Sequence, residues 1–505
     1  MKKIIFTAVA IIMIACPIAW AAETYMEAFP DANFRNYVLG VVFSGDRTGD
    51  SIVSDDDKAI MAARAEVNVG YRNIVNLTGI EYFTGITILK CYGNELVSID
   101  ISKNLALETI ETSGNNLTAL DVSKHIALKE LNCANNLITT LDVTKNTALV
   151  SLDCFYNPLL TALDVTQNTE LVRLVSGENL LTALDVTKNT KLVILECWNA
   201  LSTLDVTKNT DLERLHFGGA NLTTIDLSQN TKLKELICTS NQLVELDLSN
   251  NTELTLLWCG ENKLTELDVS KNTKLGYLIC RDNNISKLTL EGADALYELL
   301  TDGNPLKTFD VSKNLEMKYL YCRLSQLTEL DVSKNTKLIN FYCTSNDLKA
   351  LNLSNCPDLD WLFCYGNQLT ELDVSKNTKI RRLYCQDNLL TELNLSKNTE
   401  LELLQCQNNK LTALDVTYNP KLMNTSMLYC FGNYMPSPDA VKGWQSLGLQ
   451  INSPENLVSG TFRFYPQNEL PPDDEEECEL GCNAISYGFL ALALFGIATF
   501  LKNKN

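Results

Sequence analysis

One phrase of the sequence returns at a nearly fixed interval, and this period limits the folds that the chain can adopt. The phrase ELDVSKNTK stands at 266–274, at 329–337 and at 371–379. Its Asp, or the residue that replaces it, recurs in steps of 21 from Asp100 to Asp415, with one step of 22 and one of 20. A unit this short cannot bury an apolar face alone, so stability must come from stacked units with caps at both ends.

Each unit carries apolar residues at fixed places. The unit reads L-x-x-L-x-C-x-x-N-x-L-x-x-L, as from Leu233 through Cys238 and Asn241 to Leu246. Leu and Cys alternate with variable residues, which predicts a short strand with one buried face. The Asn is expected to turn the chain and to hydrogen-bond the backbone of adjacent turns.

This pattern resembles the leucine-rich repeat and is similar to the bacterial, internalin-like members of that family. The resemblance covers about residues 86–433. It implies a leucine-rich-repeat solenoid, a mostly β horseshoe whose concave side is a parallel sheet of about sixteen short strands, with an irregular convex side and terminal caps. It also implies adhesion to a host protein, another cell or the extracellular matrix. The lack of catalytic motifs predicts that the chain is not an enzyme.

Twelve of the seventeen cysteines occupy one position of the unit, and Cys430 continues the series after an irregular step. The twelve are Cys91, Cys133, Cys154, Cys197, Cys238, Cys259, Cys280, Cys322, Cys343, Cys364, Cys385 and Cys406. Spacing by one repeat excludes a zinc site, which needs close pairs. An inward Cys packs as a small hydrophobe, so we interpret the series as a buried column of free thiols. Neighbouring strands lie within disulfide range, so oxidation of adjacent pairs stays open.

Both ends carry targeting signals. Residues 1–21 have two lysines, an apolar core and a small-residue end, which predicts a Sec signal peptide cleaved after Ala21. An acidic linker at 469–480 precedes residues 481–505, where the apolar run 485–501 is long enough to cross a membrane. This last segment resembles the C-terminal sorting signals of diderm bacteria, most closely the Synergist-CTERM type, with Cys482 as a candidate processing residue. The chain is therefore expected at the cell surface or anchored in the envelope membrane, at least transiently.

Two caps are expected to flank the repeats, a helix-loop-helix at 22–85 and a C-terminal cap at 434–468. The loop at 46–57 of the first cap resembles an EF-hand loop, although Ser51 replaces the usual glycine and an Asp ends it. The candidate calcium ligands are Asp46, Thr48, Asp50, the Ile52 carbonyl, Ser54 and Asp57. The alternative is a helix-loop-helix cap that descends from a calcium-binding loop but binds no cation. No other cofactor is predicted.

Charge and motif content exclude several functions. The formal net charge of −20 argues against nucleic acid. The repeated Asp and the Lys three residues later are expected to form parallel, solvated charge columns. Only His125 and His216 are present, and neither belongs to a catalytic motif; His216 is expected to be an ordinary exposed strand residue.

The variable strand positions should point out of the concave face, because side chains alternate along a strand. One such column begins polar and turns aromatic near residues 258–384. The predicted partner-binding residues are Trp258, Tyr277, Arg281, Tyr319, Tyr321, Arg323, Tyr342, Trp361, Phe363, Tyr365, Arg382 and Tyr384. Tyr, Trp and Arg dominate binding hot spots. The alternative is that these rings stack only to stabilise the sheet.

The hypothesis is therefore a surface protein that recognises an extracellular protein through its concave face. A glycan partner and a structural envelope spacer remain as alternatives, the first because aromatic faces stack on sugar rings.

Overall fold

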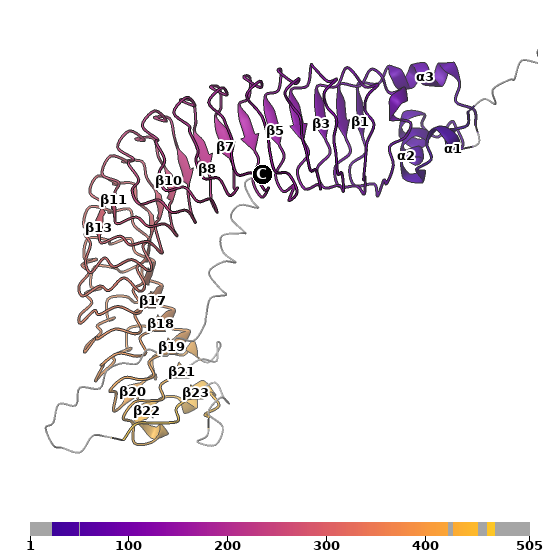
Figure 1. Cartoon of the computed structure of the whole chain (residues 1–505). Coiled ribbons are helices and arrows are strands. Elements are labelled where there is room, and N and C mark those ends of the chain that lie inside the picture. The colour runs from indigo at the N-terminus through magenta and orange to yellow at the C-terminus, as the bar shows by residue number, and fades with distance from the viewer. Residues whose placement is uncertain (1–22, 50, 423–427, 453–461, 470–505) are drawn as a thin grey trace, which may run out of the picture. The chain divides into compact units, whose positions relative to one another are not determined.

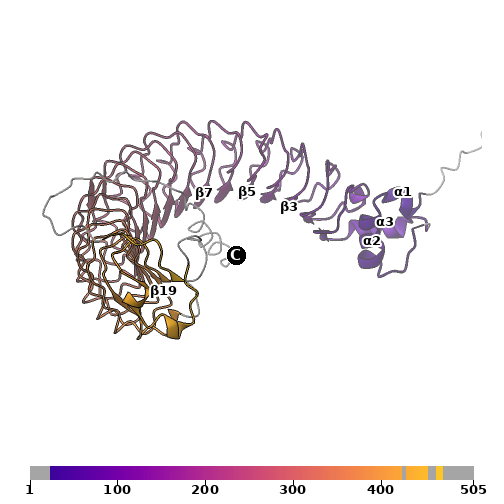
Figure 2. The same ribbon diagram turned by 90° about the horizontal axis from the view of Figure 1, so that it is seen from below.

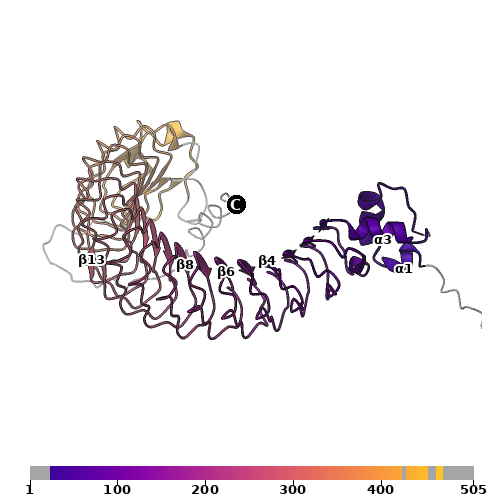
Figure 3. The ribbon, with the colours of Figure 1, turned by 90° about the horizontal axis from the view of Figure 1, so that it is seen from above.

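The computed structural model describes residues 23–49, 51–422, 428–452 and 462–469. The described residues up to Gln467 form one unit, a coil of short strands that begins with a few helices (Figure 1). Figures 2 and 3 show that the strands of this unit line the inner side of its curve.

The helices stand at the N-terminal end of the coil. They are α1 (Tyr25–Ala28), α2 (Ala32–Tyr37), the π-helical turn η1 (Val38–Val42), α3 (Asp55–Ala62) and the 3₁₀ turn η2 (Ile80–Tyr82). Side-chain caps explain where three of them begin, because Thr24, Asp31 and Ser54 each accept hydrogen bonds from the first-turn N–H groups of the helix that follows. Phe29 and Phe34 are fully buried and meet edge to face, so the helices have an apolar core of their own.

Within the described residues, 19 short strands form one parallel sheet. The strands are β1 (Glu66–Asn68), β2 (Ile88–Lys90), β3 (Thr109–Glu111), β4 (Glu130–Asn132), β5 (Ser151–Asp153), β6 (Arg173–Val175), β7 (Ile194–Glu196), β8 (Arg214–His216), β9 (Glu235–Ile237), β10 (Leu256–Trp258), β12 (Tyr277–Ile279), β14 (Glu298–Leu300), β15 (Tyr319–Tyr321), β16 (Asn340–Tyr342), β17 (Trp361–Phe363), β18 (Arg382–Tyr384), β19 (Leu403–Gln405), β21 (Leu428–Tyr429) and β23 (Phe462–Arg463). Each strand pairs with the next in this order, so that Leu131 stands between Ile110 and Leu152. The predicted leucine-rich-repeat solenoid with its concave parallel sheet is confirmed.

The sheet extends beyond the repeats that the sequence pattern delimits. β1 adds a strand before residue 86, because Val67 takes the place of the repeated Leu and pairs in register with Leu89. β21 and β23 add two more at the other end. Two small parallel pairs lie outside the main sheet: β11 (Glu266–Asp268) with β13 (Lys287–Thr289), and β20 (Leu414–Asp415) with β22 (Val441–Lys442). The short turns η3 (Pro438–Ala440) and η4 (Gln445–Leu447) complete the C-terminal end.

The repeated cysteines form the expected interior column. All of those in the series, from Cys91 to Cys430, are free and buried. Beside them runs a column of asparagines whose amides join each turn to the preceding one. The Asn136 Nδ2 donates to the Thr112 and Cys133 carbonyls at 3.0 and 3.1 Å, while its Oδ1 accepts the Leu117 N–H at 3.0 Å. The predicted role of this Asn in bonding adjacent turns is confirmed.

A second asparagine column, at the Asn of the KNT phrase, also donates to backbone carbonyls of the preceding turn. The Asn230 Nδ2 donates to the carbonyls of Val206 and Asn209 at 3.0 and 2.9 Å, whereas its buried Oδ1 has no hydrogen-bond partner. His125, Ala293 and Cys356 replace Asn in this column. The His125 Nε2 lies 3.2 Å from the Ile101 carbonyl, and the Cys356 Sγ donates to two carbonyls at 3.7 and 3.8 Å. Ala293 is the one described member of this column without a side-chain donor. Because the Ile101 carbonyl can only accept, the His125 ring carries a proton on Nε2.

We expect Asn230→Asp to lower the free energy of unfolding by roughly 2 to 4 kcal/mol, because it removes the donor from two buried carbonyls and buries a carboxylate. Asn230→Cys should cost less, since a thiol serves at position 356. The midpoints of urea unfolding followed by circular dichroism compare the two. Equal losses would mean that the column depends on side-chain volume rather than on the donated hydrogen.

The cysteine column predicts a loss of stability at high pH. Burial raises the pKa of the Cys91, Cys133 and Cys238 thiols to about 12. The unfolded chain loses these protons near pH 8.5 to 9 while the folded chain keeps them, so the stability is complete below that pH and falls as the pH rises toward 12. The slope is at most about 1.4 kcal/mol per pH unit for each thiol.

The matched variant is Cys238→Thr, because Thr112 and Thr301 already fill this column. The wild-type protein should lose thermal stability faster between pH 9 and 11 than this variant does, in melting curves recorded under reducing conditions. Parallel curves for the two proteins would contradict the burial effect.

Candidate binding surface

The concave face consists of the side chains on either side of each buried central Leu. On β15, for example, Leu320 is fully buried while Tyr319 and Tyr321 flank it and face out of the sheet. Every predicted partner-binding residue stands on these strands or directly after the column Cys, and all are half-buried except Tyr277, which is 38% exposed. The alternation seen in the sequence therefore places these residues on the concave surface.

Four of these side chains form a continuous stack across adjacent strands, which we call the aromatic column: Tyr321, Tyr342, Phe363 and Tyr384. The first pair of ring centroids lies 4.7 Å apart, the second 4.2 Å and the third 4.1 Å. The interplanar angles are 14°, 34° and 16°. The rings cover one another's faces, so they present mainly edges and hydroxyl groups to a partner. Such stacking also stabilises the sheet, by about 0.2 to 1 kcal/mol per pair.

Arginines stand on both sides of the aromatic column. The Arg382 guanidinium lies 4.4 Å from the Trp361 ring centroid and covers that indole. Arg323 donates from Nε and Nη2 to the Asp302 Oδ2 at 2.9 and 2.6 Å. Asp302 is buried, and its Oδ1 also accepts the Arg323 backbone N–H. The sequence reasoning missed Asp302, although it follows Thr301 at the same outward position as Arg281 and Arg323.

A second set of rings runs beside β12 to β15. Tyr297 lies 5.6 Å from Tyr277 and 5.3 Å from Tyr319, measured between ring centroids. Tyr297 precedes its strand and was not predicted. Trp258 occupies the same strand position as the aromatic column, three strands before Tyr321, with Ile279 and Leu300 between.

The earlier part of the concave face is charged. The Arg214 Nε donates to the Glu235 carboxylate at 2.7 Å, and the Arg173 Nη2 donates to that of Asp153 at 3.1 Å. His216 lies between Glu196 and Glu235, at 4.0 and 3.8 Å, with only 14% of its side chain exposed. The prediction of an ordinary exposed histidine was wrong, because neighbouring strands bring long charged side chains over the ring. Burial, together with Arg214, lowers the pKa of His216 to about 4, so the ring is neutral at pH 7.

The Asp and the Lys of the repeated phrase are exposed, as expected of solvated charge columns. The Asp of the repeated phrase accepts a hydrogen bond from the backbone N–H two residues on, as Asp142 Oδ1 does from Thr144 at 2.9 Å. In the described part of the chain, none of the ion pairs joins this Asp to the Lys of the phrase. The pairs form instead between acidic and basic residues 21 positions apart, such as Lys232 with Asp211 at 2.6 Å. Four such residues, Asp358, Asp360, Lys379 and Arg381, line a cavity of about 670 Å³.

The EF-hand-like loop has partners within the cap. Asp57 pairs with Arg47 at 3.0 Å, and its Oδ2 accepts the Ser54 N–H. The side chains of Ser54 and Asp57 thus cap the N-terminus of α3. The Thr48 hydroxyl lies 2.8 Å from that of Ser51, and Ile52 pairs with Thr24 in an isolated antiparallel bridge. Asp46 precedes Arg47 in the loop, and Asp50 lies outside the described residues. Among the residues that are described, no group of three or more His, Cys, Asp or Glu side chains is arranged to hold a metal ion.

The targeting signals lie outside the described residues. Neither Ala21 nor Cys482 has a described position, and the same holds for the apolar run 485–501. Among the helices that are described, none is long and apolar enough to span a membrane.

Comparison with solved structures identifies the family. The functional domain of InlJ from Listeria monocytogenes, which includes a cysteine ladder, superposes with a TM-score of 0.63 at 30% identity, over 84% of this chain and 87% of that one. This chain belongs to the internalin-like leucine-rich-repeat proteins. YopM from Yersinia enterocolitica has the same fold, with a TM-score of 0.60 at 20% identity over 81% of this chain and 92% of its own. The plant peptide hormone receptor RGFR1, solved in complex with RGF2, also has this fold. It superposes with a TM-score of 0.61 at 18% identity, over 71% of this chain and 64% of the receptor chain. No protein-family model matches the sequence, and no curated protein does.

We expect Arg323→Gln to lower the free energy of unfolding by about 1 to 3 kcal/mol, because it leaves the buried Asp302 carboxylate without its ionic partner. Arg281→Gln is the control, since its pair with Glu261 is exposed on both sides and should contribute less than about 1 kcal/mol. Chemical denaturation of both variants gives the comparison. A larger loss for Arg281→Gln would mean that the Asp302 pair does not hold this part of the face.

Proposed function

We propose that this chain is a non-enzymatic binding protein, displayed on the cell surface or anchored in the envelope, that recognises an extracellular protein through the concave face between β9 and β18. The observation that supports it most is the aromatic column, which stands on a rigid sheet with arginines beside it. The Sec signal and the sorting-type C-terminus in the sequence support the location.

The apolar part of the face is long enough for a protein partner. Its central column runs without interruption through Ile237, Trp258, Ile279, Leu300, Tyr321, Tyr342, Phe363 and Tyr384. Eight strands spaced about 4.8 Å apart extend over about 34 Å, close to the diameter of a small domain. Apolar patches on a soluble surface tend to mark interaction sites, and Tyr, Trp and Arg carry much of the binding energy in interfaces.

The geometry of the rings favours a protein over a glycan. A sugar stacks on an open aromatic face, but the rings of the aromatic column cover one another, and Arg382 covers Trp361. Ring edges, hydroxyl groups and guanidinium groups suit apolar side chains and backbone carbonyls, which a protein supplies. The complex of RGFR1 with RGF2 is an example of a peptide bound by a protein with this fold, and at 18% identity the likeness concerns the fold alone.

The test is a binding screen with a matched pair of variants. The purified protein is tested against panels of extracellular proteins and glycans, and each hit is repeated with the double variant Tyr342→Ser and Phe363→Ser. Affinity for a protein partner should fall at least tenfold, because central aromatic residues contribute about 2 kcal/mol or more each. Tyr418→Ser is the control, since Tyr418 is 56% exposed but follows the repeated LDVT phrase, away from the sheet strands.

Circular dichroism and melting of each variant establish that it is folded. Binding that survives in the double variant would place the partner elsewhere and leave the rings with a structural role. Hits confined to glycans would favour the carbohydrate alternative, and no hit for either protein would favour the envelope spacer.

A further inference from the structure

The first strand of the sheet has an unpaired edge. Ala65 and Val69 bond to the neighbouring turn, because the Ile88 N–H donates to the Ala65 carbonyl and the Val69 N–H donates to that of Lys90. Backbone groups alternate in direction along a parallel strand, so those of Glu66 and Asn68 point to the other edge. There the Asn68 N–H meets only the Tyr37 hydroxyl, at a long 3.4 Å. An exposed row of N–H and C=O groups is a template for a further strand.

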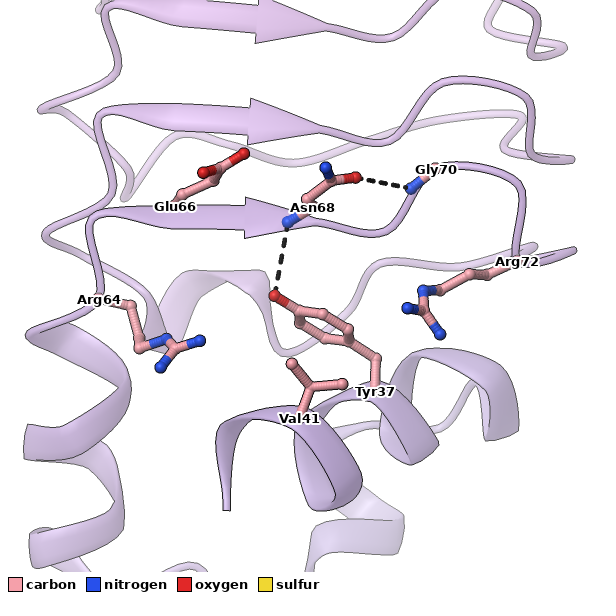
Figure 4. A pocket seen from close by; sticks show the side chains of 7 residues that line it. All are labelled: Tyr37, Val41, Arg64, Glu66, Asn68, Gly70 and Arg72. Atoms are coloured by element: carbon pink, nitrogen blue, oxygen red, sulfur yellow. Dashed lines mark hydrogen bonds between the residues drawn. The ribbon is translucent and has the colours of Figure 1, made fainter. Parts of the chain in front are cut away.

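A cavity of about 410 Å³ lies along this edge. Figure 4 shows Tyr37 and Val41 facing β1 from the helices below, with Arg64 and Arg72 at its two ends. Val41, which is 50% exposed, supplies apolar surface beside the buried Tyr37, while most of the other lining residues are polar. The cavity thus combines a strand edge, an exposed apolar side chain and two cations.

The two arginines have no carboxylate partner. Of the ion pairs within the described residues, none includes Arg64 or Arg72, although the Arg72 guanidinium stands 5.3 Å from the Tyr37 ring centroid. Glu66 also lines the cavity, and in the view of Figure 4 its carboxylate lies above β1 while both guanidinium groups lie below it. Two unpaired cations at the ends of one cavity are unusual in a chain with a net charge of −20, where most other arginines on the coil are paired with an acid.

We infer that β1 binds an extended acidic peptide, which adds to the sheet as one more strand beyond Glu66–Asn68 and places carboxylates on Arg64 and Arg72. Strand addition supplies main-chain hydrogen bonds to the free groups of Glu66 and Asn68, and the peptide displaces the weak contact with the Tyr37 hydroxyl. The carboxylates form charge-assisted bonds with the two guanidinium groups, which gives the site its preference for acidic sequences. This site is independent of the aromatic column.

The first experiment measures charge preference. A fluorescent peptide with blocked ends, Glu-Val-Glu-Val-Glu, is titrated with the full-length protein at low salt, and anisotropy reports binding. The double variant Arg64→Gln, Arg72→Gln should weaken binding at least tenfold, and raising the salt to 0.5 M should weaken it for the wild type. The peptide Lys-Val-Lys-Val-Lys should not bind. Absence of binding by the acidic peptide, or equal binding of both peptides, would overturn the inference.

The second experiment separates strand addition from simple charge attraction. Glu66→Pro removes the outward N–H while sparing the bonds between β1 and β2, because a proline is tolerated where the N–H of an edge strand faces away from its partner. Glu66→Ala removes only the carboxylate. Binding should be lost in the proline variant and kept in the alanine variant.

The same question can be tested by changing the ligand, which also covers the case in which the proline variant does not fold. An acidic peptide whose alternate backbone nitrogens are methylated cannot donate the main-chain hydrogen bonds of strand addition. This methylated peptide should fail to bind the wild-type protein. If the methylated peptide binds as well as the unmodified one, the site is only a charged patch. The Tyr342→Ser, Phe363→Ser variant should bind the acidic peptide normally, so failure here and failure at the concave face are distinguishable.

Discussion

The asparagine amides that bond across turns are the interaction on which the coil depends. Each 21-residue turn reverses direction several times, and at each reversal backbone carbonyls point inward, away from water. Asn136 and Asn230 supply hydrogens to such carbonyls on consecutive turns. Without these donors, stacking the leucines and cysteines would leave buried carbonyl groups unpaired in nearly every repeat, each at a cost in free energy.

Because the asparagines supply hydrogen bonds to the carbonyl groups inside the coil, the outward positions of the strands are free to vary. The same backbone carries Arg214 and Glu235 as an ion pair on two strands and stacks Tyr342 on Phe363 farther along. Neighbouring strands hold these side chains in register, so residues that are distant in the sequence form continuous surfaces. The concave face therefore divides into a charged zone and an apolar zone, and the proposed partner site is the second. The free edge of β1 is a different kind of site, since it arises where the stacking ends.

The fold, the buried thiols and the bonding of the repeated Asn were predictable, because a period of 21 repeats the same local environment many times. The sequence did not indicate the hydrogen-bond partner of the repeated Asp, which is the backbone N–H two residues away, as for Asp142. The predicted exposure of His216 failed because the side chains that cover it, Glu196 and Glu235, belong to the adjacent turns.

The sequence by itself determined that the chain coils, which residues face inward and which columns face out, because alternation along a strand and repetition along the chain are local properties. Only the tertiary structure decided which side chains meet. The stacking of the aromatic column, the burial of Asp302 beneath Arg323 and the pairing of acids with bases 21 positions away depend on the register between turns. The open edge at Glu66–Asn68 was likewise decided there, since an edge exists only where one strand has no neighbour on one side.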